Sequence, residues 1–131
     1  MEKRILLPGI IDNIPEEIEK AKLFVLSSNY EGMPNALMEA MALGVVCIAT
    51  NCPSGGPRYL INNGINGYLI NINSKKELSE LIKKILKDIN ENELDEISKK
   101  AIQSMNCLKE SNINQLWVNY IEKVLKDNLK V

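Results

Sequence analysis

Four short apolar runs separated by helix-forming segments constrain the fold of this chain more than any other feature. The runs are residues 4–9 (RILLPG), 23–28 (LFVLSS), 45–50 (VVCIAT) and 66–72 (NGYLINI). Continuous apolar runs of this length are typical of strands that are buried on both faces. Strands that alternate with helices form a parallel sheet with helices packed on its faces. The sequence therefore predicts an α/β fold with a parallel sheet of about four strands.

The segments between the runs carry start and stop signals of helices. Residues 12–22 place Pro15 in a first turn, residues 34–43 end before a glycine, and residues 58–64 are closed by another glycine. These segments supply the helices that flank the predicted sheet.

From Ser74 onward the chain is predicted to be entirely helical. Ser74 with Glu77 has the spacing of a capping box, Asn90 with Glu93 repeats it, and residue 111 opens a last helix. The apolar stripe of that last helix consists of Ile113, Leu116, Trp117, Tyr120, Ile121, Val124 and Leu125. Such a stripe normally packs against another apolar surface. We therefore interpret Trp117 and Tyr120 as core or interdomain residues rather than as a platform for sugar stacking.

Composition narrows the functional class. The chain has 131 residues, 45% of them hydrophobic, which is enough for one compact domain. A formal net charge of −1 gives no basic field for a nucleic-acid backbone, so no nucleic-acid partner is expected. The sequence contains no histidine, which excludes a histidine general base and the commonest zinc ligand from this chain. Any chemistry must rely on carboxylates, amides, lysine and arginine.

Cysteine usage and hydropathy indicate the compartment. Cys47, Cys52 and Cys107 are odd in number and lack C-x-x-C spacing, so we expect neither a disulfide framework nor a zinc ribbon, and a reducing cytoplasm is favoured. No run reaches the roughly 18 apolar residues of a membrane span, and the first residues lack the apolar core of a signal peptide. The lysines of residues 75–87 would suit an anionic membrane surface or the solvated face of an amphipathic helix, and the second is the simpler interpretation.

Two glutamates bracket the segment EGMPNALME, residues 31–39. Glu39 is the only charged side chain from residue 32 to residue 48. On so apolar a helix a carboxylate is costly unless it has a partner or opens onto a cleft. Asn35 and Glu39 share one helix face because they lie four residues apart. The helix starts directly after a strand, at the sheet edge where open parallel sheets bind ligands.

The start of this helix is predicted to bind a phosphate or diphosphate. Gly32 permits close approach, and the free N–H groups of the first turn suit an anion. Glu31 and Glu39 would then accept hydrogen bonds from sugar hydroxyls on either side. Alternatively, Glu31 is a solvated loop residue and Glu39 a rim residue, and Pro34 only starts the helix. Spacing alone leaves both interpretations open.

Residues 24–70 as a whole closely resemble the C-terminal nucleotide-sugar-binding domain of family 4 glycosyltransferases, which are retaining enzymes of GT-B fold. The E-x7-E pair is that family's signature, and EGMPNALMEAMALG with CPSGGPR is most similar to members that build bacterial surface polysaccharides and glycans. The resemblance implies that residues 1–131 are a single unit, the C-terminal portion of a Rossmann-like domain. It also implies sugar transfer, with retention, from a donor linked to UDP or GDP.

The resemblance implies a role for each residue of the site. Glu31 matches the glutamate that lies against the donor sugar and stabilises the reacting centre, and Glu39 matches the glutamate that holds the ribose. Ser28 matches a serine near the donor. The family uses no metal or other cofactor, because fixed dipoles stabilise the leaving diphosphate. The backbone that surrounds the diphosphate is matched by Gly32, Met33, Pro34, Asn35, Ala36 and Leu37, of which Pro34 has no N–H to donate.

Parts of the family pattern are changed or lie outside this chain. Asn51 stands where relatives usually have Asp, and Tyr59 where they usually have Glu. The basic residues that neutralise the diphosphate, the first strands of the domain and the N-terminal domain that binds a glycan or lipid-linked acceptor are expected to precede Met1. The isolated chain is therefore expected to be inactive. The alternatives are a non-catalytic nucleotide-sugar-binding or assembly subunit, or an inactive fragment.

Two further expectations concern partners. The run at residues 4–9 would be an unpaired edge strand, which we expect to pair with a second copy in a homodimer. Enzymes of surface-polysaccharide synthesis work beside membranes, so a cytoplasmic location at the inner face of the membrane is expected.

The remaining candidates have simple structural explanations. Gly55 and Gly56 form either a second anion loop or a turn that needs a permissive backbone. Arg58 faces the donor or the helix surface, and Cys47 packs in the core. The acidic run at residues 93–96 lies in a first helical turn, where acids favour the dipole, so no metal is expected there.

Overall fold

The computed structural model describes residues 5–128 and contains one parallel sheet with the strand order β1-β2-β3. β2 lies in the centre, so that its residue Ala49 is opposite Leu26 of β1 and Leu69 of β3. All four residues of β2 are buried, as expected for the middle strand of a covered sheet. The predicted α/β fold is confirmed. The strands are β1 (Phe24–Leu26), β2 (Cys47–Thr50) and β3 (Tyr68–Ile70).

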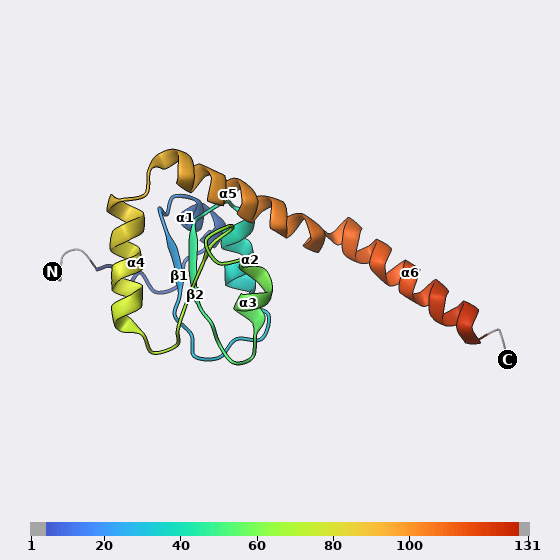
Figure 1. The fold of residues 1–131 in the computed structure, drawn as a ribbon. Helices are drawn as coiled ribbons and strands as arrows, with labels where there is room; N and C mark the ends of the chain where they lie inside the picture. The colour runs from blue at the N-terminus through green and yellow to red at the C-terminus, as the bar shows by residue number, and fades with distance from the viewer. Residues whose placement is uncertain (1–4, 129–131) are drawn as a thin grey trace.

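Helices surround this sheet and continue beyond it to the C-terminal end (Figure 1). Their positions follow the predicted alternation, although α3 starts two residues before the expected range and stops at residue 60, because Ile61 adopts an extended conformation. The helices are α1 (Ile14–Glu19), α2 (Asn35–Ala42), α3 (Gly56–Leu60), α4 (Lys75–Lys87), α5 (Glu91–Met105), the 3-10 turn η2 (Asn106–Leu108) and α6 (Glu110–Asn128).

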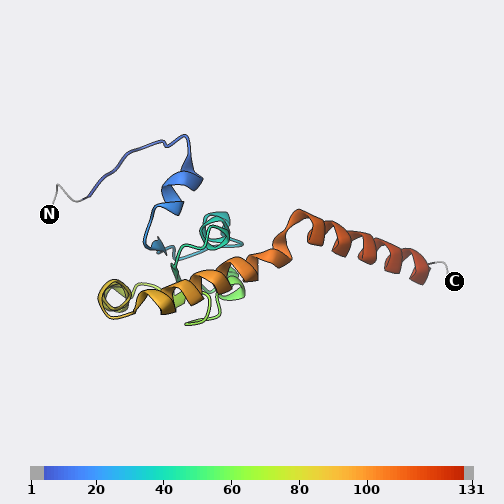
Figure 2. The same ribbon diagram turned by 90° about the horizontal axis from the view of Figure 1, so that it is seen from above.

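The strand predicted at residues 4–9 is not present in the described residues. Residue 4 lies outside the described part of the chain, and residues 5–9 have no strand assignment. Leu6 and Leu7 are 84% and 92% exposed, and this segment runs away from the sheet (Figure 2). A strand needs the backbone groups of a neighbouring strand, and within the described part of the chain no strand pairs with this segment. The described sheet therefore has three strands, and the edge expected at residues 4–9 is formed by β1 instead.

Two apolar clusters on opposite faces hold the sheet between its helices, since alternate residues of β2 point to opposite sides. Cys47 and Ala49 of β2 belong to the cluster that α2, α3 and α5 complete, with Leu37, Ala40, Met41, Leu60 and Ala101. Ile48 belongs to the cluster on the α4 side, with Ile70, Ile85 and Ile97. The protein therefore has three layers, with α2 and α4 on opposite sides of the strands (Figure 1).

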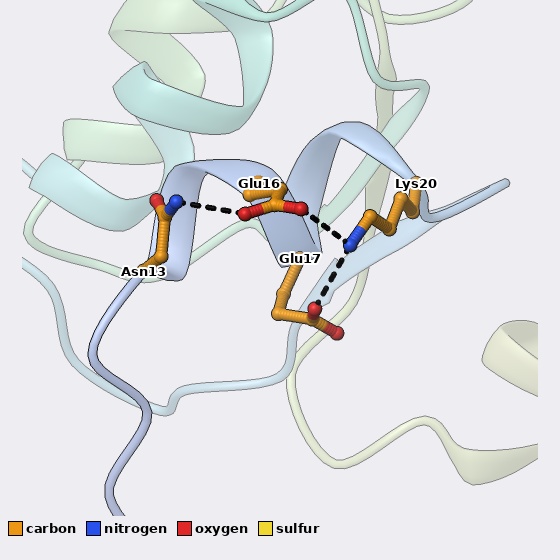
Figure 3. A network of polar contacts seen from close by, with 4 residues as sticks. All are labelled: Asn13, Glu16, Glu17 and Lys20. Atoms are coloured by element: carbon orange, nitrogen blue, oxygen red, sulfur yellow. Dashed lines mark hydrogen bonds and ion pairs between the residues drawn. The ribbon is translucent and has the colours of Figure 1, made fainter.

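The short helix α1 is accompanied by a local polar network on its exposed side (Figure 3). The Lys20 ammonium donates to Glu16 at 2.9 Å and to Glu17 at 3.3 Å, and the Asn13 amide donates to Glu16 at 2.8 Å. The two carboxylates raise the pKa of Lys20, with the hydrogen bond to Glu16 as the largest cause. Because all these side chains are exposed, the ion pairs contribute little to stability.

Only one of the two predicted capping boxes has a side chain that caps its helix. At α5 the Asn90 side chain accepts a hydrogen bond from the Glu93 N–H at 3.0 Å, as predicted. At α4 the Ser74 side chain makes no such bond. The carboxylate of Glu77 accepts instead from the Asn71 N–H at 2.9 Å. The prediction of a capping box at Ser74 is therefore wrong, because the Glu77 carboxylate is hydrogen-bonded to the loop that precedes the helix.

The last helix, α6, extends away from the three-layered body (Figures 1 and 2). In the described residues η2 is the element with which α6 makes its main contact. Trp117 and Tyr120 are 62% and 60% exposed, and their rings meet edge to face with centroids 6.4 Å apart. Core packing of these aromatic residues is thus excluded for the described chain. None of the described helices combines the length and the hydropathy needed to cross a membrane.

Candidate functional site

The predicted site lies in the loop between β1 and α2 and in the first turns of α2. Ser28 and Glu31 are half-buried, Gly32 and Glu39 are exposed, and Pro34 is buried. Met33, Asn35 and Ala36 are also exposed, whereas the Leu37 side chain is fully buried in the core. The structure therefore brings the predicted residues together at the carboxyl end of the sheet, where parallel sheets bind ligands.

The start of α2 presents backbone N–H groups that have no acceptor. Pro34 is the N-cap residue and makes no side-chain cap, while its carbonyl accepts from the N–H groups of Leu37 and Met38, each at 3.1 Å. In the described residues no acceptor meets the N–H groups of Gly32, Met33, Asn35 and Ala36. Four amides are thus open to a ligand, and the Leu37 amide, expected among them from the sequence, is already engaged. Unpaired amides and the positive end of the helix dipole favour an anion.

A second loop, which follows β2, supports the first. The Ser54 hydroxyl donates to the carbonyl of Glu31, and it accepts from the N–H of Glu31 at 3.3 Å. Closer to the strands, the hydroxyl of Thr50 and the thiol of Cys52 both donate to the carbonyl of Ser28. The backbone of the β1–α2 loop is therefore held at two points from β2 and its loop.

The two loops also meet through glycine backbones. A Cβ atom at Gly56 would lie 1.5 Å from the carbonyl oxygen of Gly32 and 3.1 Å from Cδ of Pro34. Gly55 has a φ of 86°, in the left-handed region, and precedes α3. The turn interpretation thus explains Gly55, and close approach explains Gly56. Sequence reasoning missed Ser54 altogether, and the CPSGGP motif gave no signal of its contact with Glu31.

Glu39 lines a groove of about 700 Å³ between α2 and the end of α5. The groove is mostly apolar, with Met33, Met38, Ala42, Ile102, Met105 and Leu108 in its walls and Lys109 at its edge. Neither Glu31 nor Glu39 has an ion pair or a side-chain hydrogen bond to another described residue. Both carboxylates are therefore available to accept from a ligand. Glu39 is exposed and opens onto this groove, which is one of the two situations expected for a carboxylate on so apolar a helix.

The positions that depart from the family pattern lie in or beside the second loop. The Oδ1 atom of Asn51 is buried without a hydrogen-bond partner in the described residues, and Tyr59 is 75% exposed. The guanidinium of Arg58 lies beside the turn, with Nη2 3.6 Å from the place of a Cβ at Gly55. Among residues 5–128 no three His, Cys, Asp or Glu side chains come together as a metal site would require.

Open amides at a helix start, flanked by free carboxylates at the carboxyl edge of a parallel sheet, define an α/β protein that can bind an anion carrying hydroxyl groups. In the comparison with known families, the profile of the glycosyl transferases group 1 family matches residues 1–104. The chain belongs to this family.

The chain is similar to a bacterial galactosyltransferase in sequence and to two solved structures in fold. The UDP-Gal:alpha-D-GlcNAc-diphosphoundecaprenol alpha-1,3-galactosyltransferase of Escherichia coli is 30% identical over 126 residues, which are 92% of this chain and 31% of that enzyme. The structure of HepE from Anabaena in complex with UDP superposes with a TM-score of 0.84 at 23% identity, covering 93% of this chain and 33% of HepE. TarM superposes with a TM-score of 0.74 at 27% identity, covering 91% of this chain and 24% of TarM.

These comparisons show a fold similar to that of GT-B glycosyltransferases and a family with homologues that transfer sugars in glycan biosynthesis. The chain spans about a third of the length of the first relatives it matches, 31% and 33%. The site described above lies within the matched part.

Proposed function

We propose that this chain carries part of the donor site of a family 4 glycosyltransferase that transfers a sugar from a nucleotide-sugar donor, with retention, in bacterial polysaccharide or glycan biosynthesis. The observation that carries the proposal is the set of four unengaged amides at Gly32, Met33, Asn35 and Ala36. They lie between two carboxylates that have no partner among the described residues. A diphosphate with sugars on both sides matches this arrangement of donors and acceptors.

The two glutamates divide the work in this proposal. Glu39, one helical turn into α2, accepts from the ribose hydroxyls, and Glu31, before the amides, accepts from hydroxyls of the donor sugar. The open amides stabilise the charge that develops on the leaving diphosphate, so neither glutamate acts as a nucleophile. A UDP-linked donor is favoured over a GDP-linked one, because HepE is described in complex with UDP and, in a second structure, with UDP-glucose.

The remaining features of the proposal follow from the resemblance and the composition. The reaction uses no metal cofactor, the acceptor is a glycan or a lipid-linked sugar, and the protein works in the cytoplasm beside the membrane. The acceptor binds to a part of the enzyme outside this chain. We propose that the isolated chain binds the donor but does not transfer its sugar.

The role of Glu39 is tested by NMR titration of the 131-residue chain with UDP, GDP and ADP. We expect UDP to bind and Glu39→Ala to weaken it by about tenfold or more, because a hydrogen bond to a charged group contributes about 1.5–3 kcal/mol. Glu80→Ala, an exposed glutamate on α4, is the matched control and should bind as the unmodified chain does. Equal UDP affinity in Glu39→Ala and the unmodified chain would contradict the assignment.

The role of Glu31 is tested by comparing two ligands on one variant. Glu31→Ala should weaken UDP-glucose by about fivefold or more and leave UDP almost unchanged, because only UDP-glucose carries the hydroxyls that Glu31 would accept from. The dissociation constants of both ligands are measured by the same titration. A parallel loss for both ligands would place Glu31 at the nucleotide rather than at the sugar.

A further inference from the structure

We infer that Ser54 is a positioning residue for Glu31, and that Gly56 is the spacer that lets the two loops meet. The inference rests on the proposed donor site and deepens it, because it names a residue outside the β1–α2 loop on which the geometry of that loop depends. It assigns no chemical step to Ser54. The effect of Ser54 passes through the backbone of Glu31.

The first observation is that one hydroxyl satisfies both backbone groups of Glu31. Ser54 Oγ donates to the Glu31 carbonyl and accepts from the Glu31 N–H at 3.3 Å. A residue whose N–H and C=O are both bound to one atom has little freedom in either adjacent peptide plane. The direction in which the Cα–Cβ bond of Glu31 leaves the backbone is thereby set from the loop after β2.

The second observation is that the neighbouring contact tolerates no side chain. The place of a Cβ at Gly56 is 1.5 Å from the Gly32 oxygen and 2.7 Å from the Gly32 carbonyl carbon. Both atoms belong to the backbone, so they cannot move aside as the end of a flexible side chain can. The approach of the Ser54 loop to Glu31 therefore requires glycine at position 56.

The consequence concerns the open amides as well as the carboxylate. The Gly32 carbonyl that touches Gly56 belongs to the peptide plane that also contains the Met33 N–H, one of the four unengaged amides. Ser54 consumes the Glu31 N–H, which therefore does not belong to the open set. The loop after β2 thus orients both the sugar-facing carboxylate and the first amides of the anion site.

The test separates the contact from the binding. In the chain without ligand, Ser54→Ala should speed hydrogen exchange of the Glu31 amide by about fivefold or more, since the hydrogen bond that protects it is lost. Ser54→Thr retains the hydroxyl and should restore slow exchange. Ser79→Ala, an exposed serine on α4, is the matched control and should leave the Glu31 amide unchanged. Unchanged exchange in Ser54→Ala would overturn the contact.

The second measurement is the affinity for UDP-glucose of the same variants. We expect a loss of about three- to tenfold in Ser54→Ala, recovery in Ser54→Thr, and a larger loss in Gly56→Ala, with circular dichroism as the check that each chain is folded. Faster exchange with unchanged affinity would overturn the positioning role and leave the proposed function standing. Absence of UDP-glucose binding by the unmodified chain would overturn the proposed function and, with it, the positioning role. In that case hydrogen exchange of the Glu31 amide would still show whether Ser54 contacts the Glu31 backbone.

Discussion

At the scale of single residues, sequence reasoning predicts the part of the candidate site that is local along the chain. Glu31, Gly32 and Asn35 follow one strand and start one helix, so their proximity is determined by a few consecutive residues. Ser54 is 23 residues from Glu31, and no sequence pattern around Ser54 indicates that its hydroxyl contacts Glu31. A contact of that kind depends on which loops the sheet places side by side, and a single sequence does not contain that information.

The three cysteines illustrate how burial controls chemistry at this scale. Burial raises the pKa of Cys47 from 9.0 to about 12, and Cys47 and Cys52 are 0% exposed, whereas Cys107 is exposed. The thiolate is the reactive form, so we expect one thiol per folded chain to react with Ellman's reagent at pH 8. All three cysteines should react in denaturant.

The variant Cys107→Ser should remove the fast reaction, and a second fast thiol in the folded chain would contradict the prediction.

The same shift of the Cys47 pKa affects the stability of the protein at high pH. The folded state holds the proton more tightly than the unfolded state, so this contribution to stability is fully present below pH 9.0 and is lost as the pH rises through about 12.

At the scale of elements, periodicity and turn residues locate the helices and the three described strands, because both signals are local. The strand predicted for the first apolar run, residues 4–9, is not found among the described residues, because strand formation does not depend on local signals alone. A buried strand and an exposed apolar segment have the same composition, and only a neighbouring strand distinguishes them. The capping signals show a similar limit, since Ser74 and Asn90 have identical spacing to a glutamate and only the second caps its helix.

This difference between the caps predicts different costs of substitution. Asn90→Ala should lower the free energy of unfolding by about 1 kcal/mol, because it removes the acceptor for the Glu93 N–H. Ser74→Ala should cost less than about 0.3 kcal/mol, since its side chain caps nothing. Urea denaturation of both variants measures the difference. An equal loss in the two variants would show that the Ser74 hydroxyl caps α4 in solution.

At the scale of the whole molecule, the sequence predicts which face of the last helix is apolar but not what covers it. Residues 116–118, 120, 121, 124 and 125 of α6 are between 38% and 62% exposed. The three-layered body is closed without them, because both of its apolar clusters are filled from the sheet and from α1 to α5 with η2.

A chain that ends at Lys109 should therefore keep its fold. We expect its melting temperature to lie within about 4 °C of that of the full chain, because less than about 1 kcal/mol of packing is removed. Scanning calorimetry of both chains measures the change. Ile85→Ala is the contrasting variant: Ile85 is 1% exposed, and its truncation should cost about 2–5 kcal/mol. A truncated chain as unstable as Ile85→Ala would show that α6 packs on the body.

The backbone contact of Gly56 with Gly32 makes two distant stretches of the gene behave as one locus. Because a Cβ at residue 56 would meet the carbonyl of residue 32, neither loop can change its path unless the other changes with it. Mutations in the two stretches will therefore show epistasis, and recombination between them will disrupt the loop contact that each parent sequence makes. Transplanting EGMPN alone onto another scaffold transfers the motif without the second loop that sets its backbone conformation.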